Sequence, residues 1–211
     1  MAIEMTIPLV KWNKRAIPEG ETDYEWVEES SQDLFEGKRV VLFSLPGAFT
    51  PTCSSTHLPG YEARYDELLE QDVDEVYCLS VNDSFVMNAW GADQGIVNVK
   101  PIADGNGEFT RHMGMLVEKS AVCFGLRSQR YSAVIDNGRV EMIFCEQGKE
   151  DNFAGDPFEV SDVDTMFSYL ETARDVRREE IKRYEEAQAE FEEAQAKLEE
   201  TEAEADSNED E

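Results

Sequence analysis

The sequence predicts an α/β fold built on a mixed central sheet, and two patterns lead to this prediction. Between residues 39 and 103, short apolar runs rich in β-branched side chains alternate with segments of helical character, which is the order that parallel strands joined by helices require. The turn Asn137–Gly138 then separates two runs of alternating apolar and polar residues, a pattern typical of an antiparallel hairpin. The sheet is therefore expected to contain parallel and antiparallel neighbours.

Each predicted element has a local signal. Continuous apolar runs indicate buried strands, and capping residues indicate where helices begin. In chain order we predict a turn at 18–20, a strand at 39–45, a helix at 61–71, a strand at 74–81, a helix from a cap at 82–84 to Gly91 or Gly95, a strand at 97–103, hairpin strands at 131–136 and 139–144, and a terminal helix capped by Ser161 and Asp162. Thioredoxin-like folds have this order of elements.

The charge balance excludes two classes of partner. The 211 residues carry 19 basic and 47 acidic side chains, for a formal charge of −28. Nucleic acids and anionic membrane surfaces would repel such a chain. No segment reaches the roughly 18 consecutive apolar residues of a membrane span, and the N-terminal residues lack the apolar stretch of a signal peptide. We therefore expect a cytoplasmic protein with neither a nucleic acid nor a membrane as partner.

Composition divides the chain into a globular domain at residues 1–170 and an acidic helical tail at residues 171–211. The tail carries 17 acidic and 6 basic side chains. It contains a seven-residue near-repeat, Glu185–Phe191 and Glu192–Leu198, whose apolar stripe spans only about two heptads, short of the three to four of a coiled coil. We expect a solvated, partly frayed helix that becomes disordered from about Asp206; a coiled coil or a docked helix is the alternative.

The four cysteines, at positions 53, 78, 123 and 145, show no C-x-x-C spacing, so neither a dithiol redox motif nor a zinc knuckle is predicted. With only His57 and His112 as histidines, a metal cluster is not expected either. Cysteines without a signal peptide are typical of thiols in a reducing compartment. The open question is which of the four thiols is reactive.

One segment lacks charge in a chain that is 31% charged: no Asp, Glu, Lys or Arg occurs from Val40 to Tyr61. Burial of a strand explains its first part, but the small polar residues that follow gain little from burial. Cys53 comes just after the predicted strand, at the first turn of a helix that Pro51 can begin. The positive end of a helix favours a thiolate, which is the nucleophilic form of cysteine. Cys53 is therefore the candidate nucleophile, and Thr50 can place a hydroxyl beside its sulfur.

The segment Pro46–Gly60 resembles the active-site loop of the peroxiredoxins, specifically the type-5 class, whose P-x-x-x-T-x-x-C pattern is met by Pro46, Thr50 and Cys53. Three further segments resemble the same class in the same order, at 78–83, 124–132 and 155–162, so the resemblance covers roughly residues 3–170. Residues 124–170 look most like bacterial hybrids that carry a fused glutaredoxin domain. In this chain the acidic tail stands in that domain's place.

The resemblance implies a thiol peroxidase that reduces hydrogen peroxide and organic hydroperoxides, without a cofactor or a metal. Cys53 would attack the peroxide and become a sulfenic acid, Thr50 would hydrogen-bond the substrate, and Pro46 would shield the site. Arg130 matches the essential arginine of the family best, and Arg127 is the second candidate. A guanidinium at that position would stabilise both the thiolate and the leaving oxygen.

Two other residues near this chemistry receive structural roles. His57 follows Cys53 by one helical turn, so a catalytic cysteine–histidine pair is conceivable. The resemblance to the family's Thr-His-Leu-Pro-Gly motif instead implies a packing or hydrogen-bonding role. Cys78 lies in a predicted core strand, where burial leaves a thiol inert.

The reductant and the assembly also follow from the resemblance. We expect a one-cysteine mechanism recycled by glutathione and a separate glutaredoxin; resolution by Cys145 or Cys123, or by a partner thiol such as thioredoxin, is the alternative. A homodimer is expected through the face that carries Phe49 and the segment Phe85–Trp90. The competing function is a non-catalytic redox sensor or acidic adaptor that uses oxidation of Cys53 as its signal.

Overall fold

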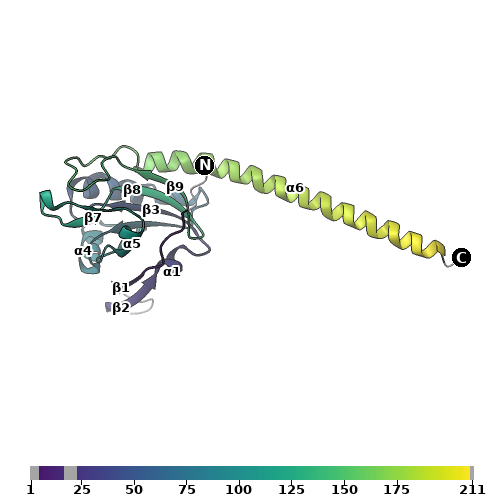
Figure 1. Cartoon of the computed structure of the whole chain (residues 1–211), viewed down its shortest axis with the longest axis horizontal. Helices are drawn as coiled ribbons and strands as arrows, with labels where there is room; N and C mark the ends of the chain where they lie inside the picture. Colours follow the sequence, from purple (N-terminus) through teal and green to yellow (C-terminus); the bar gives the residue numbers. More distant parts are fainter. Residues whose placement is uncertain (1–4, 17–22, 210–211) are drawn as a thin grey trace. The chain divides into compact units, whose positions relative to one another are not determined.

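The computed structural model describes residues 5–16 and 23–209 (Figure 1). The chain divides into two compact units, Met1–Ser168 and Tyr169–Glu211. The first unit holds the strands of the described residues, and the second is the greater part of one long helix. The turn predicted at residues 18–20 lies outside the described residues.

A five-stranded sheet forms the centre of the first unit, in the order β5-β4-β3-β8-β9. The central strand β3 (Arg39–Leu45) runs parallel to β4 (Glu75–Ser80) and antiparallel to β8 (Tyr131–Asp136). The outer strands are β5 (Lys100–Ala103) and β9 (Arg139–Cys145). Every residue of β3 and β4 is buried, as strands covered on both faces require. The prediction of a mixed central sheet is confirmed.

The two faces of this sheet carry different clusters, because neighbouring side chains on a strand point to opposite faces. On one face, alternate residues of the strands pack with the N-terminal hairpin into one core. This core includes Val40, Leu42 and Tyr131, with Cys145 at its margin. On the other face the ring of Phe43 stacks on Tyr61, with 4.2 Å between centroids. This second face supports the segment that follows β3.

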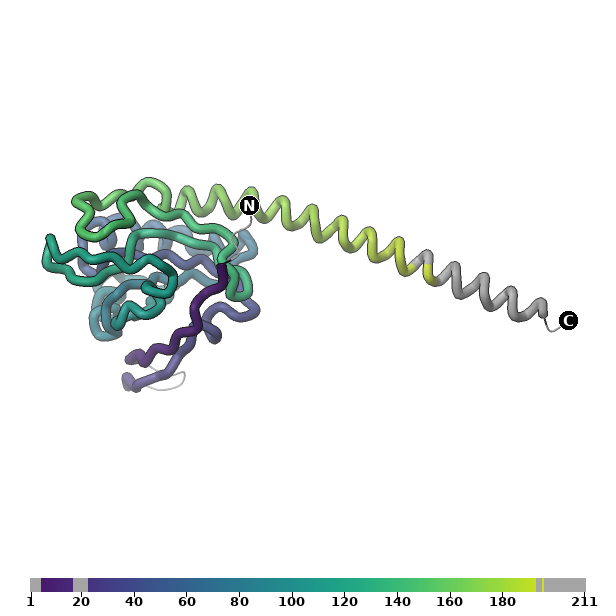
Figure 2. Tube along the Cα trace, in the orientation of Figure 1, coloured from purple at the N-terminus to yellow at the C-terminus, as the bar shows by residue number. Residues whose placement is uncertain are grey.

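The N-terminal hairpin was not predicted. Its strands β1 (Lys11–Ala16) and β2 (Glu25–Ser30) pair antiparallel and lie to one side of the central sheet, in purple in Figure 2. Their sequences are rich in charge and contain only two buried residues, Trp12 and Ser30, so the alternation that signals a strand is hidden. The other unpredicted elements are short: α1 (Ser31–Phe35), α5 (Glu108–His112), β6 (Leu116–Glu118) and β7 (Leu126–Ser128).

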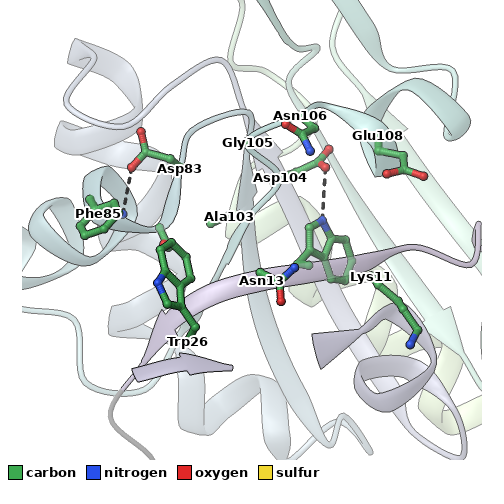
Figure 3. Close-up of a pocket in the computed structure, with 12 residues that line it drawn as sticks. Lys11, Asn13, Trp26, Asp83, Phe85, Ala103, Asp104, Gly105, Asn106 and Glu108 are labelled. Atoms are coloured by element: carbon green, nitrogen blue, oxygen red, sulfur yellow. Dashed lines mark hydrogen bonds between the residues drawn. The ribbon is translucent and has the colours of Figure 1, made fainter. Parts of the chain in front are cut away.

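A buried carboxylate anchors this hairpin to the sheet. Asp104 is fully buried and accepts hydrogen bonds from the indole of Trp12 at 3.2 Å and from the backbone and hydroxyl of Thr110. Figure 3 shows Asp104 at the margin of a cavity of about 250 Å³, between the hairpin and the start of α4. Because its hydrogen bonds are internal, Asp104 stabilises the fold and offers no reactive group to this cavity.

The helices follow the predicted order with shifted boundaries. Helix α4 (Ser84–Gln94) begins at its cap Asp83, which accepts from the backbone of Phe85 and Val86, and ends at Gly95 in the left-handed conformation. Helical geometry begins at Pro51, where the sequence indicated the first turn of a helix, and continues into the helix predicted at 61–71. The remaining segments there are α2 (Leu58–Ala63) and α3 (Tyr65–Leu69).

The terminal helix α6 (Val163–Glu209) begins after Asp162, whose carboxylate accepts from the backbone of Asp164 and Thr165. It continues beyond Asp206, where the sequence predicts disorder; residues 210 and 211 lie outside the described residues. Among the helices described, none combines the length and the apolar character of a membrane span.

Candidate functional site

Cys53 lies at the end of the loop that follows the central strand β3. It begins a π-helical turn, Cys53–His57, and its side chain is fully buried. Phe49 in this loop has φ of 60°, the left-handed region that a residue with a Cβ seldom adopts. Single π turns and strained backbone concentrate at functional sites. The sequence predicted the first turn of a helix here, but it did not predict the wider π turn.

Two side chains from other segments fix this loop. Asn82 accepts a hydrogen bond from the backbone N–H of Ala48 at 3.0 Å, and another from Ser80. Trp90 donates from its indole to the hydroxyl of Ser54 at 2.9 Å. The sequence suggested that Asn82 only capped a helix; Asp83 is the cap, and Asn82 instead positions the loop before Cys53.

Arg130 is the charged group that the fold brings to Cys53. The guanidinium is 2% exposed, and its Nη1 lies 3.5 Å from the sulfur of Cys53. The same nitrogen donates to His57 Nδ1 at 3.3 Å, and Nη2 pairs with Asp156. The phenyl ring of Phe158 lies 5.6 Å from the guanidinium carbon. Arg130 therefore holds the sulfur, the imidazole and the carboxylate in one arrangement.

The partners of His57 determine its tautomer. The guanidinium of Arg130 can only donate and the carbonyl of Ser161 can only accept, so Nδ1 is the acceptor and Nε2, 3.2 Å from Ser161, carries the proton. Burial, with the charge of Arg130, holds the pKa of His57 well below its usual 6.5. The imidazole is thus neutral and orients Arg130. It does not serve as a base.

Arg127, the second candidate arginine, lies beside Gly47 of the loop that precedes Cys53, where a Cβ on that glycine would stand 3.5 Å from its Nη1. Its guanidinium donates to the carbonyls of Val81 at 2.9 Å and Phe124 at 3.0 Å. These bonds join the β6–β7 loop to the end of β4. Burial lowers the pKa of Arg127, yet the side chain has no hydrogen bond to Cys53. Of the two arginines, the structure brings Arg130 to the sulfur.

Pro46 and Thr50 lie in the loop between β3 and Cys53. Pro46 is buried and Thr50 is half-buried. The hydroxyl of Thr50 donates to the carbonyl of Gly47 at 2.7 Å, so its oxygen lone pairs remain as acceptors for a substrate. Both residues also line a cavity of about 460 Å³, which places them between open space and the buried thiol.

The other cysteines do not meet Cys53. Cys145 lies at the margin of the core on the opposite face of the central sheet, 4.0 Å from the sulfur of Met115, and burial raises its pKa. Cys123 is exposed, in the β6–β7 loop. Cys78 is buried in β4. Burial is the main cause that raises its pKa, and the charge of Cys53 raises it further. The structure therefore brings neither Cys145 nor Cys123 into contact with Cys53.

Glu146 is a residue of this region that the sequence analysis missed. It is 3% exposed, and one carboxylate oxygen accepts from the backbone of Glu159, Val160 and Ser161 and from the hydroxyl of Ser161, at 2.8–2.9 Å. Burial raises the pKa of Glu146, but these hydrogen bonds outweigh burial and hold the pKa below its usual value. Glu146 thereby fixes the segment that carries Asp156, Phe158 and Ser161. A lone glutamate after a strand gave no signal of this role.

Comparison with known proteins decides the family. Residues 14–166 match the Redoxin family. A peroxiredoxin from Rhizobium etli is 53% identical over 173 residues, which are 81% of this chain and 97% of that protein. The chain belongs to the peroxiredoxins. The hybrid peroxiredoxin hyPrx5 of Haemophilus influenzae is also 53% identical, over 69% of this chain and 59% of that protein, and the resemblance to the type-5 class is confirmed.

The solved structures agree with this assignment. The antioxidant protein of Plasmodium falciparum, described as a 1-Cys peroxiredoxin, superposes with a TM-score of 0.75 at 35% identity, over 80% of this chain and 99% of that one. The peroxiredoxin described here has the thioredoxin-like fold and is a thiol peroxidase, which reduces a peroxide at the expense of a thiol. The predictions of fold and of enzymatic activity are confirmed.

Proposed function

We propose that Cys53 is the peroxidatic nucleophile of this peroxiredoxin, with Thr50 and Arg130 holding the peroxide and Pro46 shielding the sulfur from water. The thiolate attacks the terminal oxygen of the hydroperoxide. The S–O bond forms as the O–O bond breaks, the alkoxide or hydroxide leaves and takes a proton from solvent, and Cys53 becomes a sulfenic acid.

The contact between Arg130 and Cys53 supports this proposal most strongly. A guanidinium remains charged at any relevant pH, and here it is buried 3.5 Å from the sulfur. Its Nε–H is also buried and has no hydrogen-bond partner among the described residues. A bound peroxide oxygen would satisfy such a donor, and a fixed charge at the developing oxyanion lowers the barrier to O–O cleavage.

Replacing the sulfur tests the assignment. Cys53→Ser should abolish peroxide consumption while the circular dichroism spectrum stays the same, because the change removes the nucleophile and little volume. Cys123→Ser is the matched control, since Cys123 is exposed and does not line the cavity beside Cys53. Activity retained in Cys53→Ser, with the fold intact, would refute the proposal.

We also propose that the sulfenic acid is reduced by glutathione and a separate glutaredoxin in a one-cysteine mechanism. Cys145 lies across the central sheet from Cys53, which supports an external thiol. The 1-Cys description of the Plasmodium falciparum relative points the same way. The double variant Cys123→Ser/Cys145→Ser should keep wild-type turnover with glutathione and glutaredoxin. Loss of turnover in that variant, or activity with thioredoxin alone, would contradict this assignment.

For assembly and location we propose a homodimer in the cytoplasm. Phe49 and Phe85 are 55% and 61% exposed, and aromatic rings at such exposure favour a protein partner. Trp90, which the sequence analysis placed on the same face, is buried and hydrogen-bonded to Ser54, so it belongs to the core of the subunit. The four free thiols support a reducing compartment.

A further inference from the structure

The cavity beside the active site is larger than hydrogen peroxide requires. Its volume is about 460 Å³, whereas hydrogen peroxide occupies the space of about two water molecules, roughly 60 Å³. Cavities of several hundred cubic ångströms are typical of organic ligands. The extra space therefore suits a hydroperoxide with a substantial organic group.

The lining of this cavity combines residues of the proposed reactive site with apolar walls. Thr50 and Asp156 both line it, and Asp156 is paired with Arg130 beside Cys53. The other lining residues, most of them apolar, are Pro46, Pro51, Lys119, Ala121, Val122, Phe124, Asn152, Phe153, Ala154 and Gly155. An apolar chain would pack against these walls while its peroxide group lay at Thr50.

Hydrogen bonds between two loops hold these walls in place. Asn152 accepts through its side chain from the backbone of Ala121 at 2.8 Å, and its own N–H donates to Glu118 at 2.7 Å. Gly155 leaves room for the ring of Phe153, since a Cβ there would stand 2.7 Å from that ring. The apolar wall is therefore a built feature of the fold.

Lys119 is the cation of this cavity that has no counter-charge. Within residues 5–16 and 23–209, its ammonium group forms no ion pair, whereas Arg130 beside Cys53 is paired with Asp156. In a chain with a formal charge of −28, an unpaired lysine on an apolar cavity favours an anionic ligand group.

We propose that this cavity binds the chain of a long-chain carboxylic acid hydroperoxide, with its carboxylate at Lys119 and its peroxide at Thr50. The proposal rests on the assignment of Cys53 as nucleophile. The reaction is the one written above, with an alkoxide as leaving group that becomes a hydroxy acid. The apolar walls select for chain length, and Lys119 selects for the acid over its ester.

The rate of Cys53 oxidation in a single turnover tests this proposal without a reductant. Three peroxides are compared: hydrogen peroxide, an 18-carbon fatty acid hydroperoxide below its micelle concentration, and the methyl ester of that hydroperoxide. Wild-type protein should react with the acid about three- to fivefold faster than with the ester, the contribution of a partly exposed ion pair. Lys119→Met should bring the ratio of acid to ester to one, and Lys119→Arg should restore it.

A control variant accompanies this test, and failure of the inference can be told apart from failure of the Cys53 assignment. Lys149→Met, at an exposed lysine that does not line the cavity, should keep the wild-type ratio. Equal rates with acid and ester in the wild type, or the same ratio in Lys119→Met as in the wild type, would overturn the proposal. If hydrogen peroxide oxidises Cys53 normally in those experiments, only this inference fails. Hydrogen peroxide reduction by Cys53→Ser would instead show that the proposed nucleophile is wrong.

Discussion

Arg130 shows how one side chain can organise a reactive site. It contacts the sulfur of Cys53, the imidazole of His57 and the carboxylate of Asp156 while almost fully buried. Desolvation strengthens each of these electrostatic interactions, because the interior screens charge less than water does. The catalytic role that we propose for the arginine therefore depends on its surroundings as much as on its charge.

Removing this charge should slow the peroxidase strongly. Arg130→Met should lower the rate of hydrogen peroxide reduction about 10²–10³-fold, the usual effect of removing one group that stabilises transition-state charge. Stopped-flow measurement of Cys53 oxidation gives this rate directly. Arg127→Met is the matched control, because Arg127 bonds the loop carbonyls of Val81 and Phe124. A larger loss in Arg127→Met would show that the arginine is misassigned.

His57 should make the stability of the fold depend on pH. Burial lowers its folded-state pKa well below 6.5, so only the unfolded chain takes up this proton as pH falls through that value. The contribution of the neutral His57 to the free energy of unfolding is then fully present above pH 6.5. It is lost below that pH, by up to about 1.4 kcal/mol per pH unit. Urea unfolding at pH 7.5 and 5.5 should show a smaller pH effect in His57→Gln than in the wild type.

The comparison for this prediction is His112→Gln, at the exposed second histidine. It should keep the pH dependence of the wild type. An identical pH dependence in wild type and His57→Gln would show that His57 takes up its proton in the folded protein as well.

Among the elements, the loop between β9 and α6 is the one that completes the proposed active site. It contributes Asp156 to Arg130, Phe158 to the face of His57 at 4.8 Å between ring centroids, and the carbonyl of Ser161 to His57. Glu146 holds the end of this loop through four hydrogen bonds to one oxygen. The geometry of the proposed site thus depends on a carboxylate that does not contact Cys53.

Neutralising that carboxylate should weaken the loop. Glu146→Gln should lower the free energy of unfolding by about 1–2 kcal/mol, because hydrogen bonds to a charged acceptor are stronger than those to a neutral one. The pKa of Glu146 is held below its ordinary 4.5, so the stabilisation is present above that pH and is lost as pH falls below it. Urea unfolding at pH 7 and pH 4 measures both effects.

Glu159→Gln is the control for this prediction, since Glu159 lies in the same loop with an exposed side chain. It should behave as the wild type. If Glu146→Gln and Glu159→Gln are equally stable, the hydrogen bonds of Glu146 contribute nothing beyond the charge of the loop.

At the scale of the molecule, the tail and the catalytic chemistry should be separable. We propose residues 1–170 as the catalytic domain and residues 171–211 as an appendage. Deletion of residues 176–211 should leave the rate of peroxide reduction within about twofold of the full chain, because this segment holds none of the groups that the proposed reaction needs at Cys53. A large loss of activity in a folded truncation would show that the tail supports the site.

Assembly should respond to salt, since two subunits of formal charge −28 repel one another. Screening shortens this repulsion to about 8 Å at physiological ionic strength, so dimerisation should strengthen as salt is added. Sedimentation from low to high salt measures this. Phe85→Glu should keep the protein monomeric, whereas Val97→Glu, at an exposed residue beyond the other end of α4, should not. A wild-type monomer at every salt concentration would contradict the homodimer.

The class of the fold and the loop of the candidate nucleophile Cys53 were both predictable from the sequence. Local signals suffice for both: the apolar run of β3, the cap at Asp83 and the Asn137–Gly138 turn each depend on residues close in sequence. The absence of charge from Val40 to Tyr61 pointed to Cys53 because charged side chains avoid burial. Charge-rich strands such as β1 and β2 gave no such signal.

The contacts that distant groups make with the sulfur are seen in the tertiary structure, since no local signal specifies them. Arg130 and Cys53 are 77 residues apart, and Arg127, only three residues away, binds other carbonyls. Cys145 is separated from Cys53 by the sheet itself, because strand alternation assigns their clusters to opposite faces. Such choices arise from the packing of whole elements, where a shift of one residue along a strand reverses the face that a side chain occupies.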